Sequence, residues 1–182
     1  VKALSLGAFA TPARRVRFLR EVEIAASLRH PNIVAVFDGG ETADGVPYLT
    51  MEWVDGERLD RWCERNDPGI ERIVRVFREI AEGVRHAHRH GVLHRDLKPG
   101  NVIVDREGHA RVLDFGLAKR LSDSSGESAG TKTGEFVGTI AYAAPEQLDG
   151  SGDRSQGDLR TDVHALGALL HCMLTKRAPY VV

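Results

Sequence analysis

Two clusters of polar side chains lie on either side of a short segment that has the pattern of a tight β-hairpin. The first cluster is HRDLKPGN at residues 94–101, and the second is DFG at residues 114–116. Between them, residues 102–104 and 110–113 are apolar enough for strands, and residues 105–108 (DREG) are a turn sequence. Because the two ends of an antiparallel hairpin lie side by side, this pattern requires a fold in which the two clusters meet.

The two clusters contain the side-chain types that phosphoryl transfer needs, which are groups that position the reactants and neutralise phosphate charge. Asp96 is the candidate to accept or orient the proton of an attacking hydroxyl, and Lys98 can reach the transferred phosphate. Asn101 and Asp114 offer oxygen ligands of the kind that Mg²⁺ prefers. Each polar residue alone could be an ordinary turn residue. Their combination in this order favours a site that handles phosphate and metal.

The first third of the chain predicts one helix and one hairpin. Residues 14–29 have apolar side chains at near-helical spacing, namely Val16, Leu19, Ile24 and Leu28. The sequence His30-Pro31-Asn32 ends this helix, because proline disfavours a helical residue before it. Strands are expected at residues 33–37 and 48–54, joined by a turn at 38–47, and Asp55-Gly56 then interrupts the chain.

From residue 59 onward the pattern is mostly helical. A short helix is expected at 59–63 and a long one at 70–90, which Gly91 caps. The apolar face of the long helix contains Ile73, Val76, Phe77, Ile80, Ala81 and Val84. Residues 162–174 predict a helix that is apolar nearly all round, as a buried helix is, and residues 117–135 predict a mobile loop. The order of elements predicts an α+β fold with a small β-rich part and a larger helical part.

Composition excludes several classes of function. The 182 residues carry a net charge near −1, so no field of one sign favours nucleic acid or an anionic membrane surface. The longest apolar run, near residues 163–174, is too short to span a bilayer. Cys63 and Cys172 lie far apart and are expected to be reduced thiols. His86 and His90 have a spacing that can bind zinc, but surface histidines at a helix end are the favoured interpretation.

The sequences HRDLKPGN and DFG resemble the catalytic core of protein kinases. From Val1 to about Tyr180 the chain resembles a serine/threonine protein kinase, most like the bacterial kinases of eukaryotic type. The resemblance implies a two-lobe kinase fold that is incomplete at both ends, with part of the N-lobe at residues 1–54 and part of the C-lobe at 55–182. It implies transfer of the γ-phosphate of ATP, with Mg²⁺, to serine or threonine hydroxyls of protein substrates.

The resemblance also assigns nucleotide-binding roles. Lys2 would contact the α- and β-phosphates and Glu21 would hold it. Met51 would be the gatekeeper, and Glu52, Trp53 and Val54 the hinge whose backbone binds adenine. Apolar neighbours of the base, and a hydrophobic stack that joins the two lobes, would come from further residues of the family pattern. The neighbours of the base are Ile103 and Leu113, and the stack is Ala25, Val36, His94 and Phe115.

Substrate class and regulation follow from the same resemblance. Lys98 within DLKPGN, and the segment GTIAYAAPE at residues 138–146, resemble serine/threonine kinases. Thr139 would bridge Asp96 and Lys98, and Glu146 would pair with an arginine in C-terminal helices. Arg95 would receive a phosphate carried by the activation loop, with Thr131 or Thr133 as its site. A dimer that phosphorylates itself, and a cytoplasmic location with any membrane anchor outside this segment, also fit the family.

The chain opens at Val1-Lys2 without a preceding glycine-rich loop, and it stops soon after the helix that carries Asp162. These features predict a fragment that is poorly active and marginally stable alone, with apolar surface exposed at Leu166, Leu169 and Leu170. Two alternatives to a protein kinase remain. One is a pseudokinase that binds or signals without catalysis, and the other is a small-molecule kinase of similar fold, against which the APE segment argues.

Overall fold

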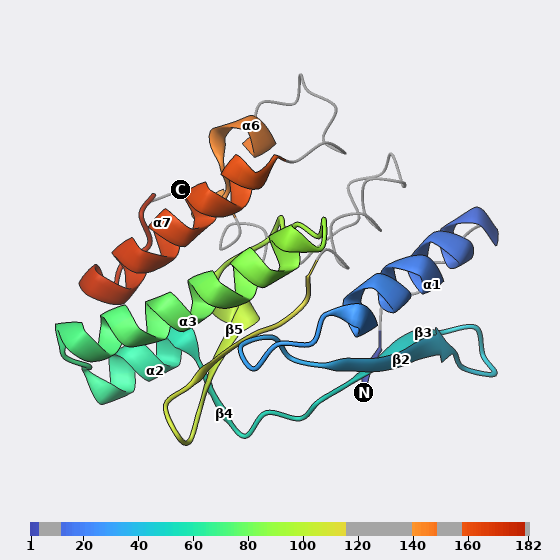
Figure 1. The fold of residues 1–182 in the computed structure, drawn as a ribbon, viewed down its shortest axis with the longest axis horizontal. Coiled ribbons are helices and arrows are strands. Elements are labelled where there is room, and N and C mark those ends of the chain that lie inside the picture. The colour runs from blue at the N-terminus through green and yellow to red at the C-terminus, as the bar shows by residue number, and fades with distance from the viewer. Residues whose placement is uncertain (4–11, 116–139, 149–157, 181–182) are drawn as a thin grey trace.

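The computed structural model of this chain describes residues 1–3, 12–115, 140–148 and 158–180 (Figure 1). The loop predicted at residues 117–135 lies outside the described residues. The strands are β1 (Lys2–Ala3), β2 (Val36–Glu41), β3 (Pro47–Met51), β4 (Gly56–Arg58), β5 (Val102–Asp105) and β6 (Ala110–Val112). The helices are α1 (Pro12–Ser27), α2 (Leu59–Asn66), α3 (Ile70–Arg89), the 3₁₀ turn η2 (Pro99–Asn101), α6 (Pro145–Leu148) and α7 (Leu159–Thr175).

The predicted α+β fold is confirmed, with a small sheet and one helix at the N-terminal end. The three strands are antiparallel in the order β1-β3-β2, and α1 packs against β2 (Figure 1). The helix and sheet enclose a compact apolar cluster, which consists of Phe18, Val22, Ala25, Val36 and Leu49. This cluster fixes α1 along the sheet, because burial of these side chains removes apolar surface from water.

Several predictions in this region are wrong in detail. Val16 and Ile24 are 68% and 38% exposed, because α1 turns Phe18, Val22 and Ala25 toward the sheet instead. The strand predicted at 33–37 begins at Val36 and continues to Glu41, and the second strand ends at Met51 rather than at residue 54. Residues 33–35 extend toward another sheet, and the turn of the hairpin is confined to residues 42–46.

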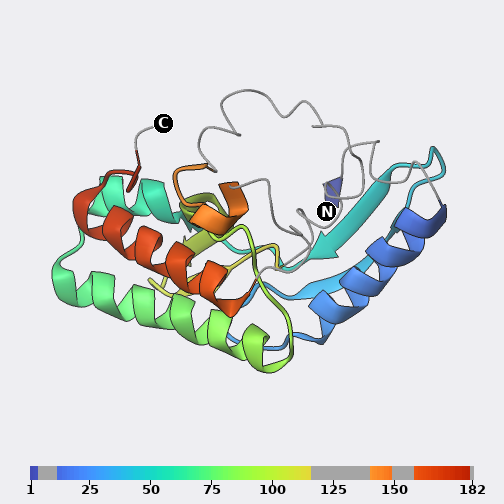
Figure 2. The ribbon, with the colours of Figure 1, turned by 90° about the horizontal axis from the view of Figure 1, so that it is seen from above.

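The larger part combines the second sheet with α2, α3 and α7. This antiparallel sheet has the order β4-β5-β6, and α3 packs against β6 and against α7. Figure 2 shows α3 and α7 side by side along this part of the molecule. The predicted apolar face of α3 is confirmed, since Ile73, Val76, Ile80 and Val84 are buried and Phe77 packs against them. Asp55-Gly56 was expected only to interrupt the chain, but Gly56 begins β4 and pairs with Asp105.

The segment after α1 joins the two parts through backbone hydrogen bonds to β6. The Val34 amide donates to the Val112 carbonyl, and the Val112 amide donates to the Asn32 carbonyl, both at 2.9 Å. The Asn32 side chain is buried and donates from Nδ2 to the Ala110 carbonyl at 3.0 Å. Gly83 of α3 lies so close that a Cβ there would approach the Asn32 carbonyl oxygen to 2.9 Å. The small part is therefore anchored to the large one at this segment.

The prediction that α7 is buried all round is wrong, and so is the prediction of exposed Leu169. Leu169 is fully buried, and Leu166 and Leu170 are partly buried against the main core. The exposed apolar side chains of α7 are instead Leu159, Val163 and Leu174. Within the described residues, none of the helices is both long and apolar enough to cross a membrane.

Candidate active site

The predicted β-hairpin forms and brings the two polar clusters together. Val102 to Val104 of β5 pair with Ala110 to Val112 of β6. The turn is held by the Asp105 carboxylate, which accepts from the Glu107 and His109 amides at 3.0 and 2.8 Å. At the open end, the Leu113 amide donates to the Asn101 carbonyl at 2.9 Å. Asp114 therefore follows directly on a residue that is hydrogen-bonded to Asn101.

Asp96 lies at the centre of a set of polar contacts within the first cluster. Its Oδ2 is 3.0 Å from Nζ of Lys98, and the Asn101 side chain donates from Nδ2 to Oδ2 at 3.2 Å. Asn101 Nδ2 also donates to the Asp96 backbone carbonyl at 2.7 Å. This double donation fixes the amide, so that its Oδ1 is the side-chain atom left to act as a ligand. The three residues thus form one rigid constellation that η2 positions.

A buried carboxylate on α7 holds the backbone before Asp96. Asp162 is 1% exposed, and its two oxygens accept from the His94 amide at 2.8 Å and the Arg95 amide at 2.7 Å. Its Oδ2 is also 2.7 Å from Nε2 of His88 on α3. Hydrogen bonds to a buried charge are stronger than neutral ones and are costly to lose. Asp162 therefore ties α3 and α7 to the residues that carry Asp96.

One residue in each polar cluster has an uncommon backbone conformation. Arg95 has φ +66° and Asp114 has φ +58°, a region that residues other than glycine rarely adopt. Such residues cost about 1–3 kcal/mol each and persist only when the surroundings enforce them. Arg95 is held on both sides. Its amide donates a hydrogen bond to Asp162, and its carbonyl accepts one from Gln147 Nε2 at 2.9 Å.

His94 connects the two clusters through its buried ring. Its Nε2 donates to the Leu113 carbonyl at 2.8 Å, and its Nδ1 accepts from the Asp96 amide at 3.3 Å. This pattern requires a neutral imidazole with the proton on Nε2. Burial lowers the pKa of His94 below its ordinary value, in agreement with that state. The ring also contacts Phe115, with centroids 4.8 Å apart.

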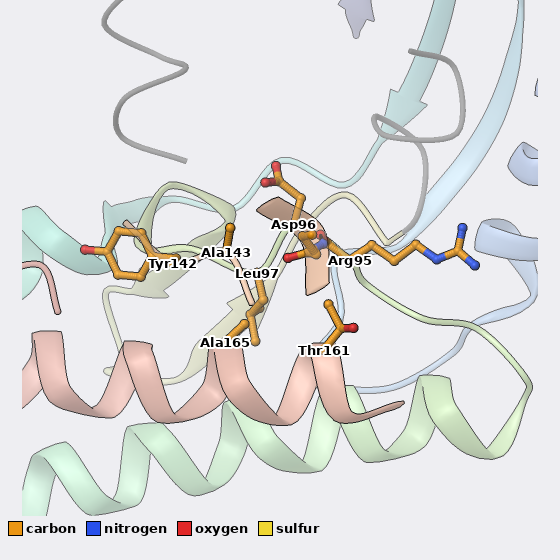
Figure 3. A pocket seen from close by; sticks show the side chains of 8 residues that line it. Arg95, Asp96, Leu97, Tyr142, Ala143, Thr161 and Ala165 are labelled. Atoms are coloured by element: carbon orange, nitrogen blue, oxygen red, sulfur yellow. Dashed lines mark hydrogen bonds between the residues drawn. The ribbon is translucent and has the colours of Figure 1, made fainter. Parts of the chain in front are cut away.

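Residues 140–148 pack beside the Asp96 loop and against α7. Besides the Gln147 contact, the Glu146 carboxylate accepts from the Thr161 hydroxyl at 2.9 Å, and the Tyr142 hydroxyl donates to Cys172 Sγ at 3.4 Å. Figure 3 shows a small hollow between these elements, in which Leu97 lies over Ala165 and the Asp96 carboxylate points away from α7. Hydrogen bonds from its own amide and from Thr161 lower the pKa of Glu146.

The candidate nucleotide-binding residues lie in the small sheet and the segment after it. Lys2 is in β1, where its backbone pairs with Leu49, and Glu21 is buried on α1. Met51 ends β3 and packs against the apolar cluster of the small part. The Glu52 amide donates to the Ala35 carbonyl at 2.8 Å, and its Oε2 accepts from the Ala35 amide at 3.3 Å.

Val54 and two neighbouring apolar residues complete this group. Within the described part of the chain, the backbone of Val54 makes no hydrogen bond, so its amide and carbonyl are available to a ligand. Ile103 lies on β5 and Leu113 follows β6, and both are partly exposed. These two side chains therefore lie on the same hairpin that carries Asn101 and Asp114 at its ends.

The donor set fits a metal only if a ligand supplies further oxygens. No group of three or more His, Cys, Asp or Glu side chains in the described residues is arranged to hold a metal ion. Asn101 and Asp114 offer one amide and one carboxylate oxygen group, and Mg²⁺ is commonly bound by one or two protein ligands together with substrate phosphates. The residues present therefore suit Mg²⁺ bound with a nucleotide.

Sequence reasoning missed three residues that shape the site. Asp162, His88 and Gln147 bond to the Asp96 loop or to one another, but each partner lies more than 50 positions away along the chain. The sequence shows only an acid near the start of a mostly apolar helix at Asp162, which is also the pattern of an ordinary first-turn acid. Thr131, Thr133 and Thr139 lie outside the described residues, so their predicted roles stay predictions.

Comparison with known proteins gives a family for this arrangement. The family described as Protein kinase domain matches residues 4–181. A probable serine/threonine-protein kinase of Streptomyces coelicolor is 40% identical over 185 residues, which cover 100% of this chain and 27% of that protein. Serine/threonine-protein kinase PknB of Mycolicibacterium smegmatis is 37% identical over 185 residues, covering 100% of this chain and 29% of that protein. The chain thus spans less than a third of the length of these relatives.

Proposed function

The chain belongs to the protein kinase domain family, and from this premise we propose that the whole protein transfers the γ-phosphate of ATP to serine or threonine hydroxyls of proteins. The observation that carries the proposal is the constellation of Asp96, Lys98 and Asn101 at the end of the hairpin that leads to Asp114. The printed names of the relatives, which are serine/threonine-protein kinases, support this acceptor class.

Asp96 accepts or orients the proton of the attacking hydroxyl in this proposal. Its Oδ2 lies 3.0 Å from the Lys98 ammonium, which is positioned to stabilise negative charge on the phosphoryl group during transfer. Asp162 and the neutral His94 act as positioning residues, because they accept from the backbone amides of residues 94–96 and do not contact the reacting atoms. Little covalent chemistry is asked of the protein, so rigidity of this loop is the main requirement.

Asn101 and Asp114 are the proposed ligands of Mg²⁺, which when bound neutralises phosphate charge. The fixed Asn101 amide supports this role, since its Nδ2 is already engaged by Asp96. Lys2 is proposed to contact the α- and β-phosphates, with buried Glu21 as its partner on α1. These assignments rest on the family pattern and on the elements that carry the residues.

The adenine base is proposed to bind along the segment after β3. The available backbone of Val54 supports this, together with the carbonyl of Glu52, whose amide is already used by Ala35. Met51 is the proposed gatekeeper, and Ile103 and Leu113 are proposed to flank the base from the hairpin. The proposal divides the chain into an N-lobe part (1–54) and a C-lobe part (55–182). The two apolar clusters support this division, except that Leu28 and Ile33 of the N-lobe part belong to the larger cluster.

Regulation by phosphorylation is proposed on the same basis. Phosphate on Thr131 or Thr133 would bind Arg95 and order the neighbouring loop, and Thr139 would bridge Asp96 and Lys98. Self-phosphorylation within a dimer is one route to that modification. Phosphopeptide mapping of an active preparation tests this proposal, and an active protein with neither Thr131 nor Thr133 modified contradicts it.

The decisive test follows radiolabelled ATP with Mg²⁺ and a generic basic protein acceptor. The full protein is compared with Asp96→Ala and Lys2→Ala, and with Asp67→Asn as a control at an exposed acid on the far end of α2. We expect label on serine and threonine of the acceptor with the wild type and the control, and a loss of at least 100-fold in the two variants, in the range of removing a positioned catalytic group. ATP binding without transfer would favour a pseudokinase. Label only on small molecules would favour a small-molecule kinase of similar fold.

A further inference from the structure

Residues of β4 and α2 line an open groove of about 600 Å³. Its lining consists of charged side chains, namely Glu57, Arg58, Arg61, Glu64 and Arg65. Both β4 and α2 pack against η2, the turn that follows Lys98 and ends at Asn101. A peptide whose hydroxyl reached Asp96 would therefore have this groove as a neighbouring surface.

Arg58 is the residue of this groove that lies closest to the catalytic constellation. It is the last residue of β4, pairs with Ile103 of β5, and stands at the N-terminus of α2. Its guanidinium covers Gly100, since a Cβ at that position would come within 2.5 Å of Nη2 and 3.2 Å of Cζ. Because Gly100 has no side chain, the Arg58 guanidinium can lie against the backbone of η2. Gly100 stands in the sequence between Lys98 and Asn101, two residues of the proposed site.

In the described part of the chain, Arg58 differs from the other two arginines of the groove in having no side-chain hydrogen bond to an acid. Arg65 is paired with Glu57, and Arg61 Nη1 is 3.3 Å from Glu64. Arg58 Nε is 3.6 Å from Asp60, beyond hydrogen-bond distance, and the side chain is 61% exposed. Among the described residues its guanidinium makes no hydrogen bond, so the donors that face neither Asp60 nor Gly100 can bind an anion.

We propose that Arg58 selects acceptor segments that carry an acidic side chain close to the phosphorylated serine or threonine. This inference rests on the proposed kinase function and adds to it a class of substrate. The planar guanidinium binds a carboxylate through two parallel hydrogen bonds, a geometry that lysine cannot provide. The contact is remote from the transferred phosphate and equal in the ground state and the transition state, so it acts on KM rather than on kcat.

The test compares pairs of serine peptides that differ only by Glu or Gln at one position, scanned across five residues on each side of the serine. At one or two neighbouring positions, the wild-type protein should prefer Glu by about 2- to 5-fold in kcat/KM, the range of a solvent-exposed ion pair. Arg58→Gln should bring this Glu-to-Gln ratio to about 1, and Arg58→Glu should bring it below 1, because the two carboxylates then repel each other. The wild-type preference should shrink in 0.5 M salt, which screens exposed charges.

The matched control is Arg78→Gln, which removes an exposed arginine paired with Glu82 on α3 and should keep the wild-type ratio. The readout is a ratio of two peptides for one protein, so a general loss of activity in a variant cancels. A wild type that phosphorylates the neutral peptides without any preference for Glu, or an Arg58→Gln variant that keeps the preference, overturns this inference alone. Failure to phosphorylate any peptide or protein overturns the proposed function and this inference with it.

Discussion

Replacement of Asp162 should release the Asp96 loop without touching a reacting atom. In Asp162→Ala the buried amides of His94 and Arg95 lose their acceptor, and His88 loses its partner. An unsatisfied buried donor costs about 1–3 kcal/mol, so the two amides alone should lower the free energy of unfolding by about 2–6 kcal/mol. This is a large part of the roughly 5–15 kcal/mol that holds an ordinary domain folded.

Asp162→Asn should be milder, because it keeps the shape and one acceptor oxygen but presents an NH₂ group to the other amide. We expect a loss of about 1–3 kcal/mol, the cost of one unsatisfied buried donor. The control is Asp158→Ala at the N-cap of the same helix, where the exposed carboxylate accepts from the Arg160 amide and forms an ion pair with the Arg160 guanidinium at 2.9 Å. Loss of such a cap costs about 0.5–2 kcal/mol.

The assays are urea unfolding of each variant and amide hydrogen exchange at positions 94 and 95. Exchange should accelerate in both Asp162 variants and remain unchanged in Asp158→Ala, which separates loop release from a general loss of stability. Phosphorylation should fall with exchange protection, because the positive φ of Arg95 is no longer enforced. An Asp162→Ala protein within about 0.5 kcal/mol of wild type, the range of neutral surface changes, and with unchanged protection at both amides would falsify this account.

Further predictions concern packing and proton linkage. Gly83→Ala should cost about 1–3 kcal/mol in urea unfolding because its methyl group would meet a backbone carbonyl, whereas Gly167→Ala on open α7 surface should stabilise by about 0.5–1 kcal/mol. The hydrogen bond with Glu79 raises the pKa of His109, so the stability it adds is complete below about pH 6.5 and is lost as pH rises through the raised pKa. His109→Gln should therefore destabilise at pH 6 and have little effect at pH 9. Burial lowers the pKa of His86, so its protonation opposes folding, and His86→Gln should lose less stability than wild type between pH 8 and pH 5.

Features that depend on neighbours in the sequence could be predicted from it. The hairpin between residues 102 and 113 has two apolar runs and a four-residue turn, and its closure alone brings Asn101 next to Asp114. The long helix α3 was predicted within one residue of its observed end, because its apolar side chains repeat over five turns and Gly91 follows with φ +73°. In both cases local pattern and tertiary packing favour the same structure.

Features that depend on tertiary partners could not be predicted. In α1, two apolar stripes compete, and the one through Phe18 and Val22 is buried only because the small sheet lies on that side. The strand β4 is three residues long and begins with glycine, so its pairing with β5 supplies what its own sequence lacks. Asp162 resembles an ordinary acid in the first turn of a helix until its partners, 67 and 68 positions away, are known.

The restraint on Arg95 joins these two levels of the structure. Its amide is held by α7 and its carbonyl by Gln147 of α6, so both sides of one strained residue depend on elements that follow the Asp96 loop in the chain. Asp96 is the next residue, and the peptide group that joins Arg95 to Asp96 sets its position. A shift of α6 can therefore act on Asp96 through a single backbone carbonyl, without contact with any reacting atom. Gln147→Ala, which removes only that donor, should loosen the Arg95 amide in hydrogen exchange less than Asp162→Ala does, because the other side of the residue remains held.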